Sequence, residues 1–212
     1  MKDLELLSED ESIFIDYTFG NVLVEYVDDD DYINHIEGTI YLEKYSGKKQ
    51  RIGKFSLKQM LLGLACNEKY DTIDLCSSTR AITEIMSSLK DDFAQWGFSE
   101  AIDDAVETNG TDVLIIERIE ILPKYRSNGI GKRVVKDIIR RFSSSVDLIA
   151  LKAFPIQFEP KDAGDNFKKR MKYSGLEQNE ELANTKLKKF YKDCGFYNVK
   201  GVDESILLMN QQ

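Results

Sequence analysis

The stretch LPKYRSNGIGKRVV, residues 122–135, places two glycines one residue apart where a strand pattern gives way to a helix pattern. Before it, DVLIIERIEILP (112–123) is apolar on both faces near its start, as in a central strand covered on both sides. Pro123 cannot donate to a strand ladder and ends this run. From Gly129 onward one helical stripe is apolar, through Ile130, Val134, Val135, Ile138, Ile139 and Phe142. The stretch therefore predicts a buried strand, a glycine loop and a helix.

The glycine loop has the chemistry of an anion site. The first N–H groups of a helix have no intrahelical partner, and the helix dipole adds partial positive charge there. Gly129 and Gly131 lack the Cβ atoms that would keep a phosphate from the backbone, and Arg126 and Lys132 add charge at the rim. A structural turn in which the glycines only ease tight packing explains the loop equally well.

Two common phosphate loops do not fit. A P-loop needs Gly five residues before its Gly-Lys pair and Ser or Thr after it, and these places hold Arg126 and Arg133. A dinucleotide fingerprint needs Gly or Ala three residues after its second Gly, and this place holds Val134.

The pattern I-L-P-x-x-R-x-x-G-I-G does fit a known family. It resembles the acetyl-CoA loop of the GNAT N-acetyltransferase superfamily, whose signature is Arg or Gln, two residues, Gly, one residue, then Gly or Ala. Arg126, Gly129 and Gly131 meet this signature, and Ile121 to Pro123 match its usual prefix.

A second motif supports the resemblance. The C-terminal helix of the family commonly carries Asn, Tyr seven residues later, and Gly-Phe four residues after that. Asn184, Tyr191, Gly195 and Phe196 have this spacing. The strand pattern VDLIALKAF lies between the motifs, where the family has its fifth strand. The resemblance covers about residues 111–210.

The resemblance implies an α/β (mixed α+β) fold with a mostly antiparallel mixed sheet and helices on both faces. The fourth and fifth strands, here residues 113–121 and 147–154, would splay apart. We expect one acetyltransferase-like domain over 1–212, with a divergent half at 1–110 and an acetyl-CoA-binding half at 111–212. A polar insertion at about 156–182 interrupts this second half. It would cover the acceptor side or form a mobile surface excursion.

The resemblance also implies where acetyl-CoA binds. The backbone of Ile119 and Ile121 would pair with the pantetheine amides, and Asn184 would hydrogen-bond the same arm. Tyr191 would protonate the departing thiolate. No metal is implied. The pyrophosphate would be held by backbone N–H groups of Ser127, Asn128, Gly129, Ile130, Gly131 and Lys132.

A carboxylate is the preferred general base, because the single His35 lies far upstream in an expected loop. By strand alternation Glu117 and Glu120 would point to opposite faces, with Glu117 sharing the face of Ile119 and Ile121. Glu117 is therefore preferred, acting directly or through a water. Structural readings stay open: Arg118 could pair across the sheet with these charges, and Tyr191 could be core packing.

The function implied is acetyl transfer from acetyl-CoA to a primary amine by direct attack in a ternary complex. The alternative is a non-catalytic acyl-CoA-binding regulatory or interaction protein on the same fold. The acceptor would be a small molecule or a protein, and the net charge of −8 favours a cationic acceptor over nucleic acid. A homodimer is compatible with the sequence.

Composition suggests a cytoplasmic protein without membrane contact. No apolar run approaches the roughly 20 residues of a membrane span, and the acidic N-terminus lacks the apolar core of a signal peptide. The three Cys form no CxxC pair and indicate reduced thiols.

The first half departs from the family, which places two helices between its first two strands. Residues 12–27 predict a hairpin broken at Gly20-Asn21, and 38–45 a further strand. Residues 56–66 predict a helix, and the stretch from Ser78 or Thr79 to Trp96 predicts another. The helices thus come just before the motif strand.

Overall fold

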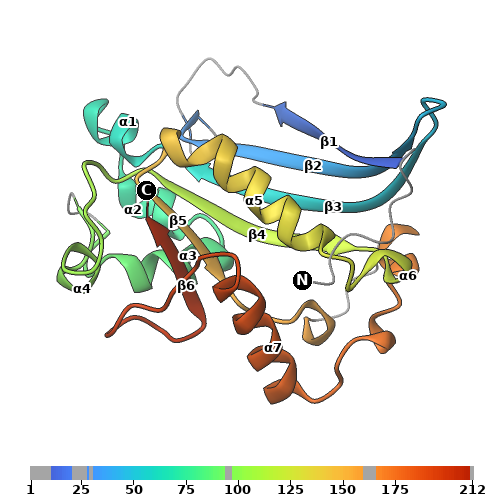
Figure 1. The fold of residues 1–212 in the computed structure, drawn as a ribbon. Helices are drawn as coiled ribbons and strands as arrows, with labels where there is room; N and C mark the ends of the chain where they lie inside the picture. Colours follow the sequence, from blue (N-terminus) through green and yellow to red (C-terminus); the bar gives the residue numbers. More distant parts are fainter. Residues whose placement is uncertain (1–10, 21–27, 29–30, 94–96, 160–165, 211–212) are drawn as a thin grey trace.

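The computed structural model describes residues 11–20, 28, 31–93, 97–159 and 166–210. Six strands form one sheet in the order of the chain (Figure 1). Neighbouring strands are antiparallel, except that β4 and β5 are parallel. The strands are β1 (Glu11–Gly20), β2 (Ile33–Lys44), β3 (Lys49–Met60), β4 (Val113–Ile121), β5 (Leu148–Lys152) and β6 (Ile206–Asn210).

Helices cover both faces of this sheet. One face carries α5 (Ile130–Phe142) and α7 (Glu180–Lys192). The other carries a group between β3 and β4: α1 (Leu62–Asn67), α2 (Thr72–Ser77), α3 (Arg80–Leu89) and α4 (Glu100–Asp103). The mostly antiparallel mixed sheet with helices on both faces confirms the expected fold class.

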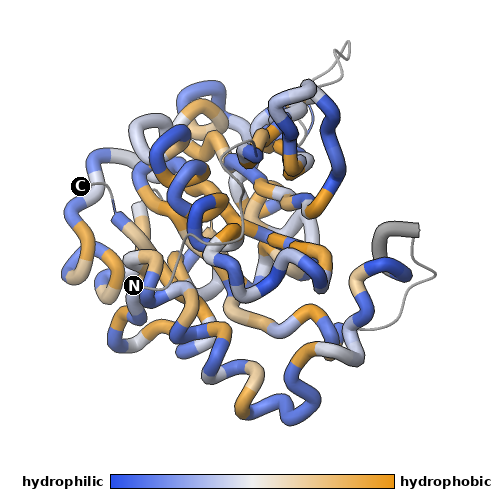
Figure 2. The backbone as a smooth tube through the Cα atoms, turned by 45° about the vertical axis from the view of Figure 1, so that its right-hand side comes forward, coloured by the Kyte–Doolittle hydropathy of each residue, from blue (hydrophilic) through white to orange (hydrophobic). Residues whose placement is uncertain are grey.

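Strand alternation in β4 divides the core into two layers. Val113 and Ile115 pack in the cluster with α1–α4, whereas Leu114 and Ile116 pack in the cluster with α5. All four side chains are almost completely buried. Figure 2 shows the same distribution, with hydrophobic residues along the interior strands and hydrophilic residues on outer loops.

The expected helix at 56–66 is wrong in its first half. β3 continues to Met60, because this segment pairs with β2 on one side and β4 on the other. Pairing on both edges outweighs the helical character of the run, and α1 begins only at Leu62. The helix predicted from 78 or 79 to 96 begins as expected as α3, capped by the Thr79 side chain, which accepts from Ile82 N at 3.3 Å. Its predicted second half is wrong, because α3 ends at Leu89, where Lys90 takes an extended conformation.

The expected hairpin at 12–27 is only partly testable. Its first strand is β1, which pairs with β2, the strand that contains most of the predicted 38–45 segment. The predicted second strand falls largely on residues 21–27, outside the described residues, as does Trp96 at the predicted end of α3.

The second half follows the prediction closely. The last helix begins four residues earlier than expected, at Glu180, because the Asn179 side chain accepts from Leu182 N at 3.0 Å. Gly195 follows the helix with φ +106°, the left-handed conformation expected at that place. The insertion contains a short helix, α6 (Asn166–Met171).

β4 and β5 separate towards their carboxyl ends. Their pairing runs from Val113–Leu148 to Ile115–Ala150, and β4 then continues to Ile121 paired with β3 but, in the described chain, without a strand on its β5 side. This confirms the splay expected between residues 113–121 and 147–154.

Candidate functional site

A β-bulge at Glu117 reorients the carboxyl half of β4. Arg118 pairs with Ser56 of β3 but Ile116 pairs with Leu57, so Glu117 is an extra residue without a partner in the ladder. A bulge shifts the alternation of every side chain that follows it.

The expectation that Glu117 and Glu120 point to opposite faces is therefore wrong. Glu117 lies 3.1 Å from Lys58 Nζ and Glu120 lies 3.3 Å from Lys54 Nζ. Lys54 and Lys58 share one face of β3, so the two carboxylates do too. Ile119 and Ile121 instead pack in the α5 cluster on the other face.

The peptide groups of Ile119 and Ile121 face the gap between β4 and β5. Leu122 N donates to Ile52 O of β3 at 2.8 Å, and successive peptide groups of a strand point to opposite edges. The Ile121 carbonyl accordingly accepts on the gap side, from Arg126 Nε at 2.8 Å. Apart from the Ile121 carbonyl, which Arg126 occupies, the gap thus offers a strand edge that no strand of the described chain covers, of the kind that binds extended ligands.

A cleft of about 580 Å³ opens at this gap. Its size is within the range of small-molecule and cofactor sites. The apolar part of its lining includes Ile119, Ile121, Phe190 and Tyr191, and the charged part includes Glu117, Arg118 and Lys152. The glycine loop also lines the cleft, with Ser127, Gly129, Ile130, Gly131 and Lys132.

Different structural features explain why glycine stands at each of the two positions in the loop. Gly129 is the N-cap of α5 with φ +71°, and a Cβ added to it would have no described heavy atom within 4 Å. A Cβ on Gly131 would lie 3.3 Å from Cζ of Phe190. Gly129 therefore fits the anion-cradle interpretation, and Gly131 fits the packing interpretation.

Arg126 does not act simply as a charge at the rim. Its guanidinium donates to the Ile121 carbonyl at 2.8 Å and to the Met171 carbonyl at 2.6 Å. Burial lowers the pKa of this guanidinium from its ordinary value. Arg126 thus joins the end of β4 to the end of α6, while it also lines the cleft.

Tyr191 lies inside the cleft and is 9% exposed. The ring of Phe190 packs against it edge-on at 5.1 Å between centroids, and that of Phe196 at 5.9 Å. Burial raises the pKa of the Tyr191 hydroxyl above its ordinary value. The hydroxyl is therefore protonated throughout the physiological range, and Tyr191 both packs and faces the cleft.

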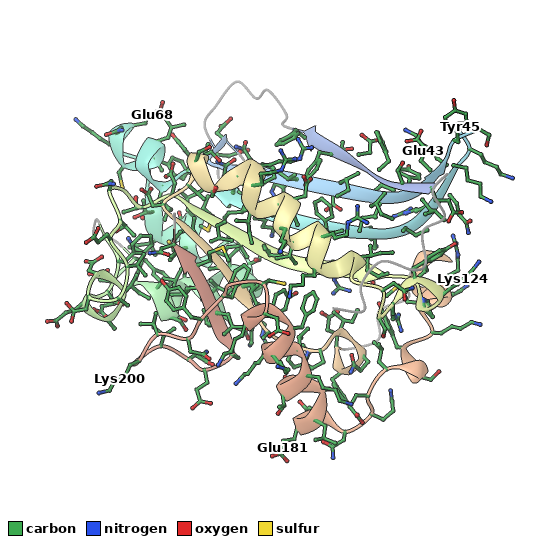
Figure 3. All side chains as sticks on the ribbon, viewed as in Figure 1. Glu43, Tyr45, Glu68, Lys124, Glu181 and Lys200 are labelled. Carbon is green, nitrogen blue, oxygen red and sulfur yellow. The ribbon has the colours of Figure 1, made fainter. Side chains whose placement is uncertain are left out.

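Asn184 is not among the residues that line this cleft. It borders a separate open hollow on α7, together with Glu180, Glu181, Thr185 and Lys188. Glu181 projects outward at the start of α7 in Figure 3. The side of α7 that lines the cleft carries Ala183, Lys186, Leu187, Phe190 and Tyr191. Asn128 is the one residue of the 127–132 loop that does not line the cleft.

Ion pairs flank the charged part of the cleft. Glu117 pairs with Lys58, which is 9% exposed. Lys152, on β5, pairs with Glu84 of α3 at 2.9 Å, and this hydrogen bond lowers the pKa of Glu84. Sequence reasoning missed Lys58, Lys152 and Glu84, because no motif contains them and only the sheet brings them together.

The suggested pairing of Arg118 across the sheet is not what the ion pairs show: Arg118 pairs with Glu159 of the insertion and, at 3.9 Å, with Glu120 of its own strand. Tyr173, also in the insertion, donates its hydroxyl to Glu120 Oε1 at 2.8 Å. Glu120 is completely buried. The described parts of the insertion are thus docked on the carboxyl end of β4.

Within the described ranges, no group of three or more His, Cys, Asp or Glu side chains could hold a metal ion. Among the same residues, no helix combines the length and apolar character needed to cross a bilayer.

Comparisons with known proteins add little at the level of sequence. No family model matches the chain, and no curated protein matches it. One solved structure is similar, AtaT complexed with acetyl-methionyl-tRNAfMet, at 12% identity and a TM-score of 0.40. The match covers 85% of this chain and 72% of that chain. A similarity of this size carries no functional argument, and the proposals below rest on the residues of this chain.

Proposed function

We propose that this protein is an acetyl-CoA-dependent N-acetyltransferase that acts on a primary amine in a ternary complex. One observation carries the proposal. The unpaired edge of β4 opens into a single cleft that has an uncapped glycine loop at one place and Tyr191 at another. The GNAT motifs in the sequence fall on these same elements.

Coenzyme A fits the residues present. An extended pantetheine arm can pair with the peptide groups of Ile119 and Ile121 as a short added strand. Its pyrophosphate suits the start of α5, where no described side chain caps the N–H groups and Gly129 leaves the approach open. Lys132, at the same place, adds a positive charge.

The thioester supplies the activated acetyl group, so the protein has to manage only protons and orientation. Glu117, at the charged part of the cleft, would take a proton from the attacking amine, directly or through a water. A backbone N–H of β4 at the gap would donate to the carbonyl oxygen as it gains negative charge. Tyr191, which keeps its proton at neutral pH, would donate it to the thiolate.

The acceptor would approach from the face of α3, because Glu117 and its partner Lys58 lie on that face. The net charge of −8 favours a cationic amine, carried by a small molecule or a protein. The acceptor screen should also include an aminoacyl-tRNA, because nucleic acid is the class of acceptor that the net charge disfavours. Its acetylation would overturn the expectation drawn from net charge.

Calorimetric titration with acetyl-CoA, CoA and ATP tests the proposal first. We expect micromolar binding of both CoA species and no binding of ATP, followed by transfer in an amine screen. If neither acetyl-CoA nor CoA binds, the proposal is overturned. Binding without turnover of any amine would support the alternative, a non-catalytic acyl-CoA-binding protein.

A further inference from the structure

The insertion between β5 and α7 supplies part of the cleft itself. Its described side chains Ile156, Gln157, Met171, Leu176 and Glu177 line the cleft together with β4, α5 and α7. Figure 1 shows the chain leaving β5, reaching α6 beside the end of β4, and then returning to α7. A loop of this length is uncommon in a compact domain and is often functional.

Contacts on the β4 side fix one end of this wall. Arg126 donates to the Met171 carbonyl, and Met171 is 1% exposed in a small cluster with Leu122. Tyr173 donates to the buried carboxylate of Glu120 at 2.8 Å. A hydrogen bond to a buried charged group contributes more than one between neutral groups.

Contacts on the α7 side fix the other end. Glu177 forms an ion pair with Lys186 of α7. Gln157 Nε2 donates to the Glu177 carbonyl at 2.9 Å. This hydrogen bond joins the segment that follows β5 to the segment that precedes α7. The described insertion therefore runs from the end of β4 to α7 along one side of the cleft.

We propose that this wall is a binding surface for the pantetheine arm of coenzyme A, so that the apolar side chains of Leu176 and Ile156 contact the arm. The inference rests on the proposed function. The arm is the fitting occupant because it is the apolar, amide-containing part of coenzyme A, and it must lie between the unpaired edge of β4 and the glycine loop. The wall lines the same cleft as the β4 edge, the glycine loop, Leu187 and Phe190.

The test compares two ligands and three single variants. Coenzyme A contains the arm, whereas adenosine 3′,5′-bisphosphate is the nucleotide part without it. Leu176→Ala removes an apolar contact from the wall. Leu182→Ala is the matched control, since Leu182 is 51% exposed on α7 and does not line the cleft. Tyr173→Phe removes the hydrogen bond that anchors the wall to Glu120.

We expect Leu176→Ala to raise the Kd for coenzyme A about five- to tenfold, from the apolar area of a half-buried Leu. The Kd for the bisphosphate should be unchanged, and Leu182→Ala should alter neither. Tyr173→Phe should weaken coenzyme A selectively as well. An unchanged Kd for coenzyme A in Leu176→Ala would overturn the inference, as would equal weakening of both ligands. Failure of the wild-type protein to bind coenzyme A would instead overturn the proposed function.

Discussion

Gly131 at the start of α5 and Phe190 near the end of α7 lie directly against each other, with 3.3 Å from an added Cβ to Cζ of the ring. Gly131 belongs to the first motif of the sequence, and Phe190 is next to Tyr191 of the second. Their contact brings the glycine loop and the Tyr191 segment to the same cleft. It also means that a side chain at the second glycine of the loop would press on the Phe190 ring.

Gly131→Ala and Gly129→Ala should therefore differ. At Gly131 the Phe190 ring has to give by a few tenths of an ångström, so the free energy of unfolding should fall by less than about 1 kcal/mol. At Gly129 the left-handed φ of +71° should cost about 1–2 kcal/mol. The added Cβ would also stand in the proposed phosphate site. Urea denaturation and titration with CoA measure both effects, and equal stability of the two variants would contradict this reasoning.

Tyr191→Phe should separate catalysis from binding. We expect the transfer rate to fall at least about tenfold, because the thiolate loses its proton donor, while the Kd for acetyl-CoA stays unchanged. Single-turnover kinetics and calorimetry provide the two measurements. An unaltered rate would leave Tyr191 with a packing role only, alongside Phe190 and Phe196.

Glu117→Gln should lower the rate at pH 7 by about 100-fold without changing acetyl-CoA affinity, because the amide cannot accept a proton. The variant should also lose some stability, since the 9% exposed Lys58 loses its partner. Measuring the pH–rate profile is decisive here. A variant that keeps the acidic limb of the wild-type profile would show that another group is the base.

Glu84→Gln should destabilise the protein in a pH-dependent way. The hydrogen bond from Lys152 lowers the folded-state pKa of Glu84 below its ordinary value of 4.5. The resulting stabilisation is fully present above the unfolded-state pKa, and it is lost as pH falls through the folded-state pKa. Wild type and variant should therefore differ in unfolding midpoint at pH 7 and converge at pH values well below 4.5. A constant difference across this range would argue against the ion pair.

Arg126→Lys should cost about 1–2 kcal/mol of unfolding free energy, although the charge is kept. A single ammonium group cannot reproduce the two guanidinium contacts to the Ile121 and Met171 carbonyls. Urea denaturation measures the loss. An unchanged midpoint would indicate that these contacts add no net stability.

Local patterns were sufficient for the second half of the fold. The apolar stripe from Ile130 predicted α5, and the run from residue 112 predicted β4, because each pattern reflects the burial of one element against its immediate neighbours. The run from Ser56 to Cys66 misled for the opposite reason. Its apolar character suits a helix or a buried strand, and only pairing with β2 and β4 decides between them.

The sequence by itself determined the strand–glycine loop–helix unit and the positions of Gly129 and Tyr191, since these depend on backbone conformation and helical spacing. The tertiary structure decided what faces the cleft. The bulge at Glu117 shifted the side chains after it, so that Ile119 and Ile121 face α5 while Glu117 stays on the face of Lys58, and the rotation of α7 left Asn184 outside the cleft. Bulges depend on pairing between strands, and helix rotation depends on packing against a distant surface. Contacts of this kind join residues far apart in the chain, so no local pattern encodes them.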